Sequence, residues 1–259
     1  MSRPDTFLVG NGRAAIAFYR VGRALVTWST RLLTRMSIEG RENLPPSGAY
    51  VLAPVHRSYI DTPIAACVTT RRLRFLGKDS MWKYGWFGWV LSALGAIPVT
   101  RNTADREAMQ RARTVLDAGE PLVLFPEGER KEGPIVQPLF DGAVYVALRA
   151  GVPIVPVGIG GSQAVMPKGA RMLRPAKVRV VIGEPIMPTV AAGARVPRRE
   201  LSAHSARLHA ELQRLFDLSM VGVGWSYPPV LADDVSNGTS DDATAGAEPS
   251  GDAGVSSAD

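Results

Sequence analysis

The sequence contains one cysteine, Cys67, and three histidines among 259 residues. A single cysteine excludes a disulfide framework and any site built from several thiolates. Cys67 lies in the apolar run 64–68, so we expect an inert core thiol. No cluster of residue types suggests a metal site, and we expect neither a metal nor a bound cofactor.

The sequence also lacks a clear membrane-spanning or secretory segment. Residues 84–100 are uncharged and mostly apolar, but they fall short of the roughly 20 residues that a spanning helix needs. Glycines and Pro98 interrupt them further. This tryptophan-rich segment fits either a buried core helix or a helix at the depth of lipid headgroups. Arginines interrupt the first 36 residues, so we expect no secretory signal.

Positive charge is concentrated in the first nine tenths of the chain. Residues 232–259 hold seven of the 24 acids and none of the 30 basic residues, so residues 1–231 carry a net charge of +13. A body this basic is typical of proteins that meet an anionic partner, either nucleic acid, a lipid surface or a phosphorylated ligand. The acidic tail has almost nothing to bury and is predicted to be disordered.

Residues 13–36 predict an amphipathic helix. On a helical projection its arginines fall within an arc of about 120°, opposite an aromatic and aliphatic side. Two interpretations remain open, a helix in a membrane interface and a surface helix packed on its own domain. The basic side consists of Arg13, Arg20, Arg23, Arg31 and Arg35, and the apolar side of Phe18, Val21, Leu25, Trp28, Leu32 and Leu33.

Short apolar runs alternate with helical patterns along the rest of the chain. This alternation predicts an α/β fold, a single domain around a mostly parallel sheet flanked by helices, with the amphipathic membrane-interface helix at its N-terminal end. We expect a membrane-interface segment at 1–37, a catalytic domain at 38–228 and a disordered tail at 229–259. Strands are predicted at 49–53, 73–76, 96–99, 121–125, 153–159 and 177–182, and helices at 63–70, 84–95, 104–118, 142–150 and 198–218.

His56 and Asp61 follow the first predicted strand directly. A histidine with a carboxylate partner can act as a general base, because the carboxylate fixes the ring and stabilises its protonated form. Five positions on a regular helix are about 140° apart, so the two side chains can meet only if His56 lies in the loop and Asp61 at the helix start. Pro63 supports this arrangement. The alternative is that Asp61 or Thr62 only caps the helix.

Three further charged positions follow predicted strands. Phe125–Lys131 reads FPEGERK, in which Gly128 permits a close approach of the backbone and Arg130 offers charge to a phosphate. Arg101 ends the run GAIPVTR, and Lys78 follows the run LRFL. Each cation alone is an ordinary surface charge, but three of them at strand ends of one sheet point to a phosphorylated ligand.

Four blocks in this order carry a family resemblance. They are H-x4-D at 56–61, GAIPVTR at 95–101, FPEGER at 125–130 and VPIVPVGI at 152–159. Together they make residues 38–187 resemble the PlsC-type glycerolipid acyltransferases, the 1-acyl-sn-glycerol-3-phosphate acyltransferases. The resemblance implies acyl transfer from acyl-CoA or acyl-carrier protein to the sn-2 hydroxyl of lysophosphatidic acid, without a covalent acyl-enzyme. It further implies a peripheral or monotopic protein on the cytoplasmic face of the cell membrane.

The resemblance also implies residue roles. His56 would be the general base and Asp61 its orienting partner. Substrate would be bound by Lys78, Arg101, Glu127, Gly128 and Arg130, and Pro156 would belong to a block linked to the acyl donor or to catalysis.

The chain departs from the family pattern at two positions. Val55 stands where asparagine is common, and Glu129 stands where threonine or serine is common. A carboxylate pointing at the acceptor phosphate would repel it. Glycerol 3-phosphate or another lysolipid is therefore an alternative acceptor.

Other functional classes fit the sequence less well. Residues 10–15 read G-x-G-x-x-A but lack the acid that a dinucleotide site places about 20 residues on. Residues 160–164 form an imperfect nucleophile elbow around Ser162 without an acid between Ser162 and His204. A non-catalytic basic membrane-binding protein remains a remote alternative, and we expect no nucleic-acid partner. His204 and His209 lie on an arginine-rich helical pattern and are predicted to be solvated.

Overall fold

The computed structural model describes residues 13–99, 105–166 and 172–225. The described residues belong to one compact unit, in which the N-terminal helix and the sheet lie together. The predicted boundaries at 37 and 228 remain predictions, and the predicted disordered tail lies outside the described residues.

A seven-stranded sheet forms the centre of this unit, in the order β1-β7-β6-β2-β5-β3-β4. The strands from β6 to β4 are parallel to their neighbours, whereas β7 runs antiparallel to β6 and parallel to β1. The predicted α/β fold with a mostly parallel sheet is thus confirmed. The strands are β1 (Ser37–Glu39), β2 (Val51–Pro54), β3 (Arg74–Lys78), β4 (Ala96–Val99), β5 (Leu122–Val123), β6 (Ile154–Gly160) and β7 (Arg179–Ile182).

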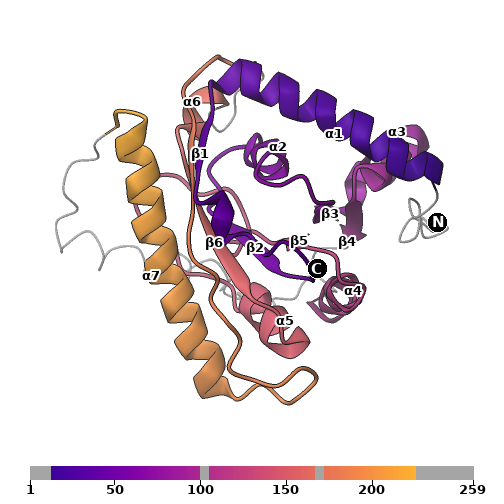
Figure 1. The fold of residues 1–259 in the computed structure, drawn as a ribbon, viewed down its shortest axis with the longest axis vertical. Helices are drawn as coiled ribbons and strands as arrows, with labels where there is room; N and C mark the ends of the chain where they lie inside the picture. Colours follow the sequence, from indigo (N-terminus) through magenta and orange to yellow (C-terminus); the bar gives the residue numbers. More distant parts are fainter. Residues whose placement is uncertain (1–12, 100–104, 167–171, 226–259) are drawn as a thin grey trace, which may run out of the picture. The chain divides into compact units, whose positions relative to one another are not determined.

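Helices cover the sheet and its ends (Figure 1). They are α1 (Arg13–Thr34), α2 (Asp61–Ala66), α3 (Gly85–Ala93), α4 (Asp105–Asp117), α5 (Gly142–Ala150), α6 (Ser162–Val165) and α7 (Arg198–Gly222), with short 3-10 helices η1 (Arg41–Asn43) and η2 (Asp79–Lys83). Most of these elements start within two or three residues of their predicted positions. Strand β1 was not predicted, because three residues are too few to show a periodic pattern.

The core depends on close contact between β6 and α7. Every residue of β6 is buried, and two of its glycines lie directly against the helix backbone. A Cβ added at Gly158 would lie 2.3 Å from the carbonyl oxygen of Leu215, and one at Gly160 would lie 2.5 Å from Ser219. The absence of side chains at these positions lets the helix approach the strand. This packing fixes β6 beside β2, the strand that leads to His56.

The prediction that His204 and His209 are solvated is wrong for His204. His204 is buried on the side of α7 that faces the protein, and its ring nitrogens lie 2.9 Å from the Glu200 carbonyl and 3.3 Å from the Met187 carbonyl. His209 is partly buried, with Nε2 2.8 Å from the Val136 carbonyl. Helix periodicity located the arginine-rich side, but the loops that cover the other side come from distant parts of the chain.

Helix α1 packs on the protein through a face beside its arginine side, and its apolar side faces outward. Arg23 is partly buried, whereas Arg20, Arg31 and Arg35 are exposed. Tyr19, Thr30 and Thr34 are buried, and the Arg23 guanidinium donates to the Thr69 carbonyl. The helix lies over α2 and reaches α3 (Figure 1). The apolar face of α1, which we define as Val21, Leu25, Trp28 and Leu32, is between 62% and 68% exposed. This is the reverse of a helix packed on a hydrophobic core.

Candidate active site

The two sequence blocks that carry the most polar residues follow neighbouring parallel strands. Strand β2 ends at Pro54 and leads into the loop with His56, and β5 ends at Val123 and leads into the loop 125–131. Because parallel strands end at the same edge of a sheet, the loops lie side by side. The Lys131 amide donates to the His56 carbonyl at 2.9 Å, which joins them directly.

His56 and Asp61 form a hydrogen-bonded pair. Nδ1 of His56 lies 3.0 Å from Oδ2 of Asp61. The Asp61 side chain is wholly buried, whereas 16% of the His56 side chain is exposed. The ring of His56 also stacks on Phe125, with centroids 4.1 Å apart. The arrangement predicted from the sequence, with His56 in the loop and Asp61 at the first position of α2, is the one observed.

Asp61 does not cap its helix. Its Oδ2 accepts the amides of Arg57 and Ser58, each at 2.6 Å, and both belong to the preceding loop. The carboxylate therefore shapes the loop that carries His56. Ser58 adds a hydrogen bond from Oγ to the Met166 carbonyl at 2.9 Å.

The Asp61 bond also settles which ring nitrogen of His56 faces outward. A carboxylate in this position accepts from Nδ1–H, so Nε2 is the nitrogen left to accept a proton. Among the described residues, none makes a hydrogen bond to Nε2. A partly exposed Nε2 with a buried acid behind the ring is the geometry of a general base.

A buried ion pair joins the two loops below His56. Nη1 of Arg57 lies 2.7 Å from both Oε1 and Oε2 of Glu127, and both side chains are almost fully buried. Glu127 also accepts the His56 amide at 2.9 Å and the Gln137 amide at 3.2 Å. Arg57 further donates to the Ile135 carbonyl and lies over the ring of Phe216 in α7. Four contacts thus occupy the Glu127 carboxylate, which was predicted to bind substrate, and it is not exposed.

Arg130 lies beside the histidine loop. Its guanidinium sits 3.3 Å from the ring centroid of Tyr59, which is itself 55% exposed. Gly128 has a φ of +72°, a conformation that L side chains rarely adopt, and a Cβ there would lie 2.6 Å from the ring of Phe140. These two predicted site residues therefore lie in the loop next to His56, with Arg130 partly exposed.

Glu129, the departure from the family pattern, does not lie buried in this loop. Its side chain is 66% exposed, and its carboxylate forms an ion pair with the Lys131 ammonium at 2.8 Å. The neighbouring cation offsets its charge.

The remaining predicted site residues are less well placed. Lys78 ends β3 at the same edge of the sheet, where it pairs with Val99 of β4. Arg101 follows β4 and lies outside the described residues. Pro156 is buried within β6, opposite Ala53 of β2, so it supports the strand that leads to His56.

Two alternatives from the sequence can be examined directly. Ser162 is fully buried, and its Oγ has no hydrogen-bond partner in the described structure. A nucleophile must reach its substrate, so the structure does not support the nucleophile elbow. Among residues 13–99, 105–166 and 172–225, no group of three or more His, Cys, Asp or Glu side chains could hold a metal ion. The expected absence of a cofactor stays a prediction.

The sequence analysis did not identify Arg57. The residue directly follows His56, so its position could have drawn notice, but an arginine beside a histidine has no fixed role. Only its pairing with a glutamate 70 residues away shows what it does.

Comparison with known proteins finds similarity to acyltransferases. Residues 35–160 match the family model described as Acyltransferase. A 1-acyl-sn-glycerol-3-phosphate acyltransferase of Chlamydomonas reinhardtii is 31% identical over 62% of this chain and 49% of its own length. A protein of the same name from Bacillus subtilis is 26% identical over 70% of this chain and 87% of its own length. The chain thus spans about half the length of the algal relative.

The fold has a counterpart among solved structures. The crystal structure of the 1-acyl-sn-glycerophosphate (LPA) acyltransferase PlsC from Thermotoga maritima superposes with a TM-score of 0.64 at 24% identity, covering 86% of this chain and 87% of that chain. This likeness extends the shared architecture well beyond the segment that the family model matches.

Proposed function

We propose that this chain, whose residues 35–160 match the Acyltransferase family model and which resembles proteins named 1-acyl-sn-glycerol-3-phosphate acyltransferase, transfers an acyl chain to the sn-2 hydroxyl of lysophosphatidic acid and forms phosphatidic acid. The acyl donor is the thioester of acyl-CoA or acyl-carrier protein. The observation that carries the proposal is the 3.0 Å bond between His56 Nδ1 and buried Asp61, at a strand end beside Arg130.

The reaction follows from the orientation of His56. Its Nε2 takes the proton of the acceptor hydroxyl as the oxygen attacks the thioester carbonyl, and Asp61 stabilises the positive ring that results. When the tetrahedral intermediate collapses, the carbon–sulfur bond breaks and the leaving thiolate takes the proton from Nε2. The products are an ester and a free thiol, and the histidine returns to its starting state.

Cations at the same sheet edge would bind the acceptor phosphate. Arg130 is held beside the histidine loop by Tyr59, and Lys78 ends β3 at that edge. Arg101 stays a predicted member of this set. Glu129 is paired with Lys131 in an exposed position, so it gives no reason to prefer another acceptor over lysophosphatidic acid.

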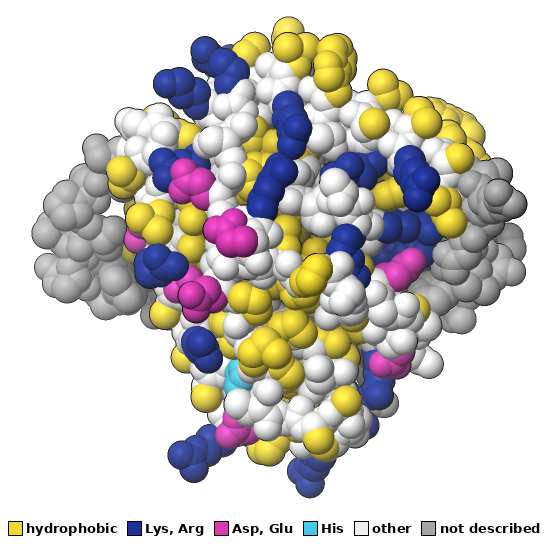
Figure 2. Space-filling model, viewed as in Figure 1, with side chains coloured by type: hydrophobic (Ala, Val, Ile, Leu, Met, Phe, Trp, Pro, Cys, Tyr) yellow, Lys and Arg dark blue, Asp and Glu magenta, His cyan; other side chains and the backbone are white. Residues whose placement is uncertain are grey.

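The apolar surface on α1 and α3 supports a membrane-bound site. Phe18 of α1 contacts Trp89 of α3, with ring centroids 4.9 Å apart, and Trp86 of α3 is 75% exposed. Figure 2 shows apolar side chains along the edge of the molecule where α1 runs, with basic side chains beside them. In the described part of the chain, the helices are too short or too polar to cross a bilayer. We propose a peripheral or monotopic attachment to the cytoplasmic face of the membrane.

Acyl transfer by the purified protein tests this function. Wild type and His56→Ala are incubated with palmitoyl-CoA or oleoyl-CoA, and with lysophosphatidic acid or glycerol 3-phosphate. We expect phosphatidic acid from the wild type and a loss of about 10²- to 10⁴-fold in the variant. Transfer only to glycerol 3-phosphate would retain the mechanism and change the acceptor. If His56→Ala, folded, transfers at the wild-type rate, the proposed mechanism is wrong.

A further inference from the structure

A second group of cations lies away from His56, at the opposite edge of the sheet. A cavity of about 400 Å³ opens between α1, the segment that leads into β3 and the turn after α4. It lies near the start of β3, whereas the candidate active site lies where the parallel strands end. Six residues line it: Ile16, Tyr19, Arg20, Thr70, Arg72 and Glu120.

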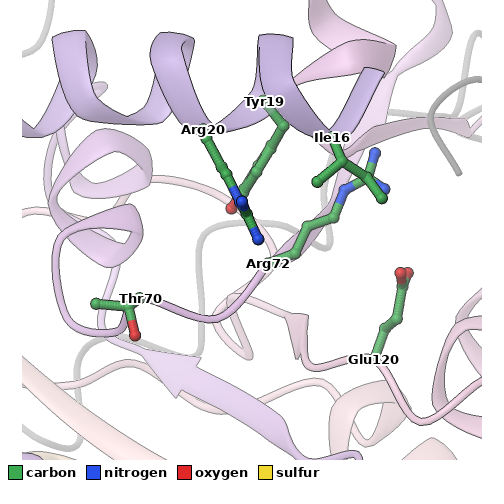
Figure 3. A pocket seen from close by; sticks show the side chains of 6 residues that line it. All are labelled: Ile16, Tyr19, Arg20, Thr70, Arg72 and Glu120. Carbon is green, nitrogen blue, oxygen red and sulfur yellow. The ribbon is translucent and has the colours of Figure 1, made fainter. Parts of the chain in front are cut away.

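Two arginines reach this cavity from opposite sides. Arg20 extends down from α1, and Arg72 extends up from the segment before β3 (Figure 3). The Arg72 guanidinium lies 5.2 Å from the ring centroid of Tyr19, and Tyr19 is held by the hydrogen bond from the Leu73 amide to its hydroxyl. Arg20 makes no ion pair with any described residue. The cavity therefore has cations on two walls and a rigid aromatic side chain between them.

The acid in the cavity offsets these cations only in part. Glu120 accepts from Nε and Nη2 of Arg74, which is itself almost buried, so its carboxylate is shared between Arg74 and the cavity. Burial lowers the pKa of Arg72 and the positive charge of Arg74 lowers it further, which Glu120 and Tyr19 counter only in part. An anion in the cavity would favour the charged form of Arg72, since it would supply the opposite charge and hydrogen-bond acceptors.

The position of the cavity indicates which anion it meets. The cavity lies on the inner side of α1, whose outer side is the exposed apolar face. A helix that lies in a membrane interface buries its apolar face among the acyl chains, so its polar side is at headgroup depth. A second cavity along the same helix is also basic, since Arg23 and Arg31 line it. Phosphate groups of lipids would thus be the anions nearest to Arg20 and Arg72.

We propose that the cavity between α1 and β3 binds the headgroup phosphate of an anionic phospholipid. Arg20 and Arg72 contact the phosphate, and Thr70 and Tyr19 border the space that it fills. The bound lipid would link α1 to the sheet and orient the protein on the membrane. The inference rests on the membrane attachment in the proposed function, but not on the acyl-transfer reaction, and it concerns a site separate from the one at His56.

Sedimentation of the 259-residue chain with vesicles tests the proposal. The vesicles contain either phosphatidylcholine alone or phosphatidylcholine with phosphatidylglycerol. We expect Arg20→Gln and Arg72→Gln each to lower the affinity for the anionic vesicles about fivefold. Arg35→Gln is the matched control, because Arg35 is exposed just after the same helix and lines neither cavity.

A second variant separates a defined site from diffuse attraction. Thr70→Phe fills part of the cavity without changing the charge, so a diffuse attraction would be unaffected, whereas a defined site would lose affinity for anionic vesicles. The proposal is wrong if Thr70→Phe and Arg20→Gln bind like the wild type, or if Arg35→Gln loses as much affinity as Arg20→Gln. Thermal unfolding with and without inorganic phosphate is the third arm. Stabilisation by free phosphate with no preference for anionic vesicles would overturn a lipid as the ligand.

Acyl transfer measured on the same samples keeps the two proposals apart. The lipid site would be supported if a cavity variant lost binding to anionic vesicles but still turned over a soluble short-chain substrate. If the wild type shows no acyl transfer but its vesicle binding still requires Arg20 and the open cavity, only the proposed reaction is wrong.

Discussion

Arg57 and Glu127, which are 70 residues apart in the sequence, form a buried ion pair, with Nη1 2.7 Å from each carboxylate oxygen. The pair joins the loop after β2 to the loop after β5. Since Glu127 also accepts the His56 amide, the pair fixes the backbone of the residue that we assign as the base.

Breaking this pair is expected to lower the free energy of unfolding. Arg57→Met leaves a buried carboxylate without its cation, which costs about 3–5 kcal/mol in free energy of unfolding. The double variant Arg57→Met, Glu127→Leu removes both charges and should recover part of that stability. It should not recover activity, because the His56 amide has lost its acceptor. Urea unfolding and turnover of the three proteins measure both effects, and a double variant with wild-type turnover would contradict the positioning role.

Removing the charge of Asp61 should slow the reaction without unfolding the protein. Asp61→Asn retains an oxygen for the loop amides but cannot stabilise a positively charged His56. We expect kcat to fall about 10²- to 10⁴-fold. Asp141→Asn, in an exposed acid that bonds to Ser205, is the matched control and should turn over like the wild type. An unchanged kcat in Asp61→Asn would show that Asp61 does not assist His56 in the reaction.

A methyl group between β6 and α7 should destabilise the protein. A Cβ at Gly158 would lie 2.3 Å from the Leu215 carbonyl oxygen and 2.4 Å from its carbon, so Gly158→Ala must displace the helix. Overpacking of this kind costs about 1–3 kcal/mol. Gly85→Ala is the control, because nothing lies within 4 Å of a Cβ there. Thermal unfolding compares the two, and equal melting temperatures would show that α7 is not held by this contact.

The free energy of unfolding should fall at alkaline pH. Burial raises the pKa of the Cys67 thiol above its ordinary value of 9.0. Above that pH the unfolded chain loses a proton that the folded protein retains, so the unfolded state is increasingly favoured as the pH rises. Denaturant unfolding below and above pH 9 should show the decline, and Cys67→Ala should show a smaller one. A thiol reagent that modified native Cys67 as fast as a free thiol would contradict its burial.

The apolar face of α1 should control membrane binding. Trp28 is 66% exposed, and replacing it by serine removes apolar area that the lipid would bury. We expect Trp28→Ser to weaken binding to neutral vesicles roughly tenfold. Leu218→Ser is the matched control, because Leu218 is also exposed but lies on α7. Equal binding of both variants would show that α1 does not enter the interface.

Several features were predictable because neighbouring residues encode them. The spacing of apolar residues, together with the turn residues, predicted nearly every long helix and the strands β2 to β7. The five-residue spacing of His56 and Asp61, with Pro63 behind them, limited the pair to one geometry, and the structure has it. The antiparallel course of β7 was not predictable, since a strand's residues do not state which neighbour it joins. The burial of His204 depends in the same way on a distant loop that supplies the Met187 carbonyl.

The sequence by itself determined the order of strands and helices, the H-x4-D pair at a strand end and the amphipathic pattern of α1, because each depends on residues close together in the chain. Only the tertiary structure decided that Arg57 pairs with Glu127, that Glu129 is exposed and that the apolar side of α1 faces outward. Those outcomes depend on the order of strands in the sheet and on which surfaces meet. Arg57 and Glu127 are 70 positions apart, and the surfaces that cover or expose a side chain come from distant parts of the chain, which no local pattern records.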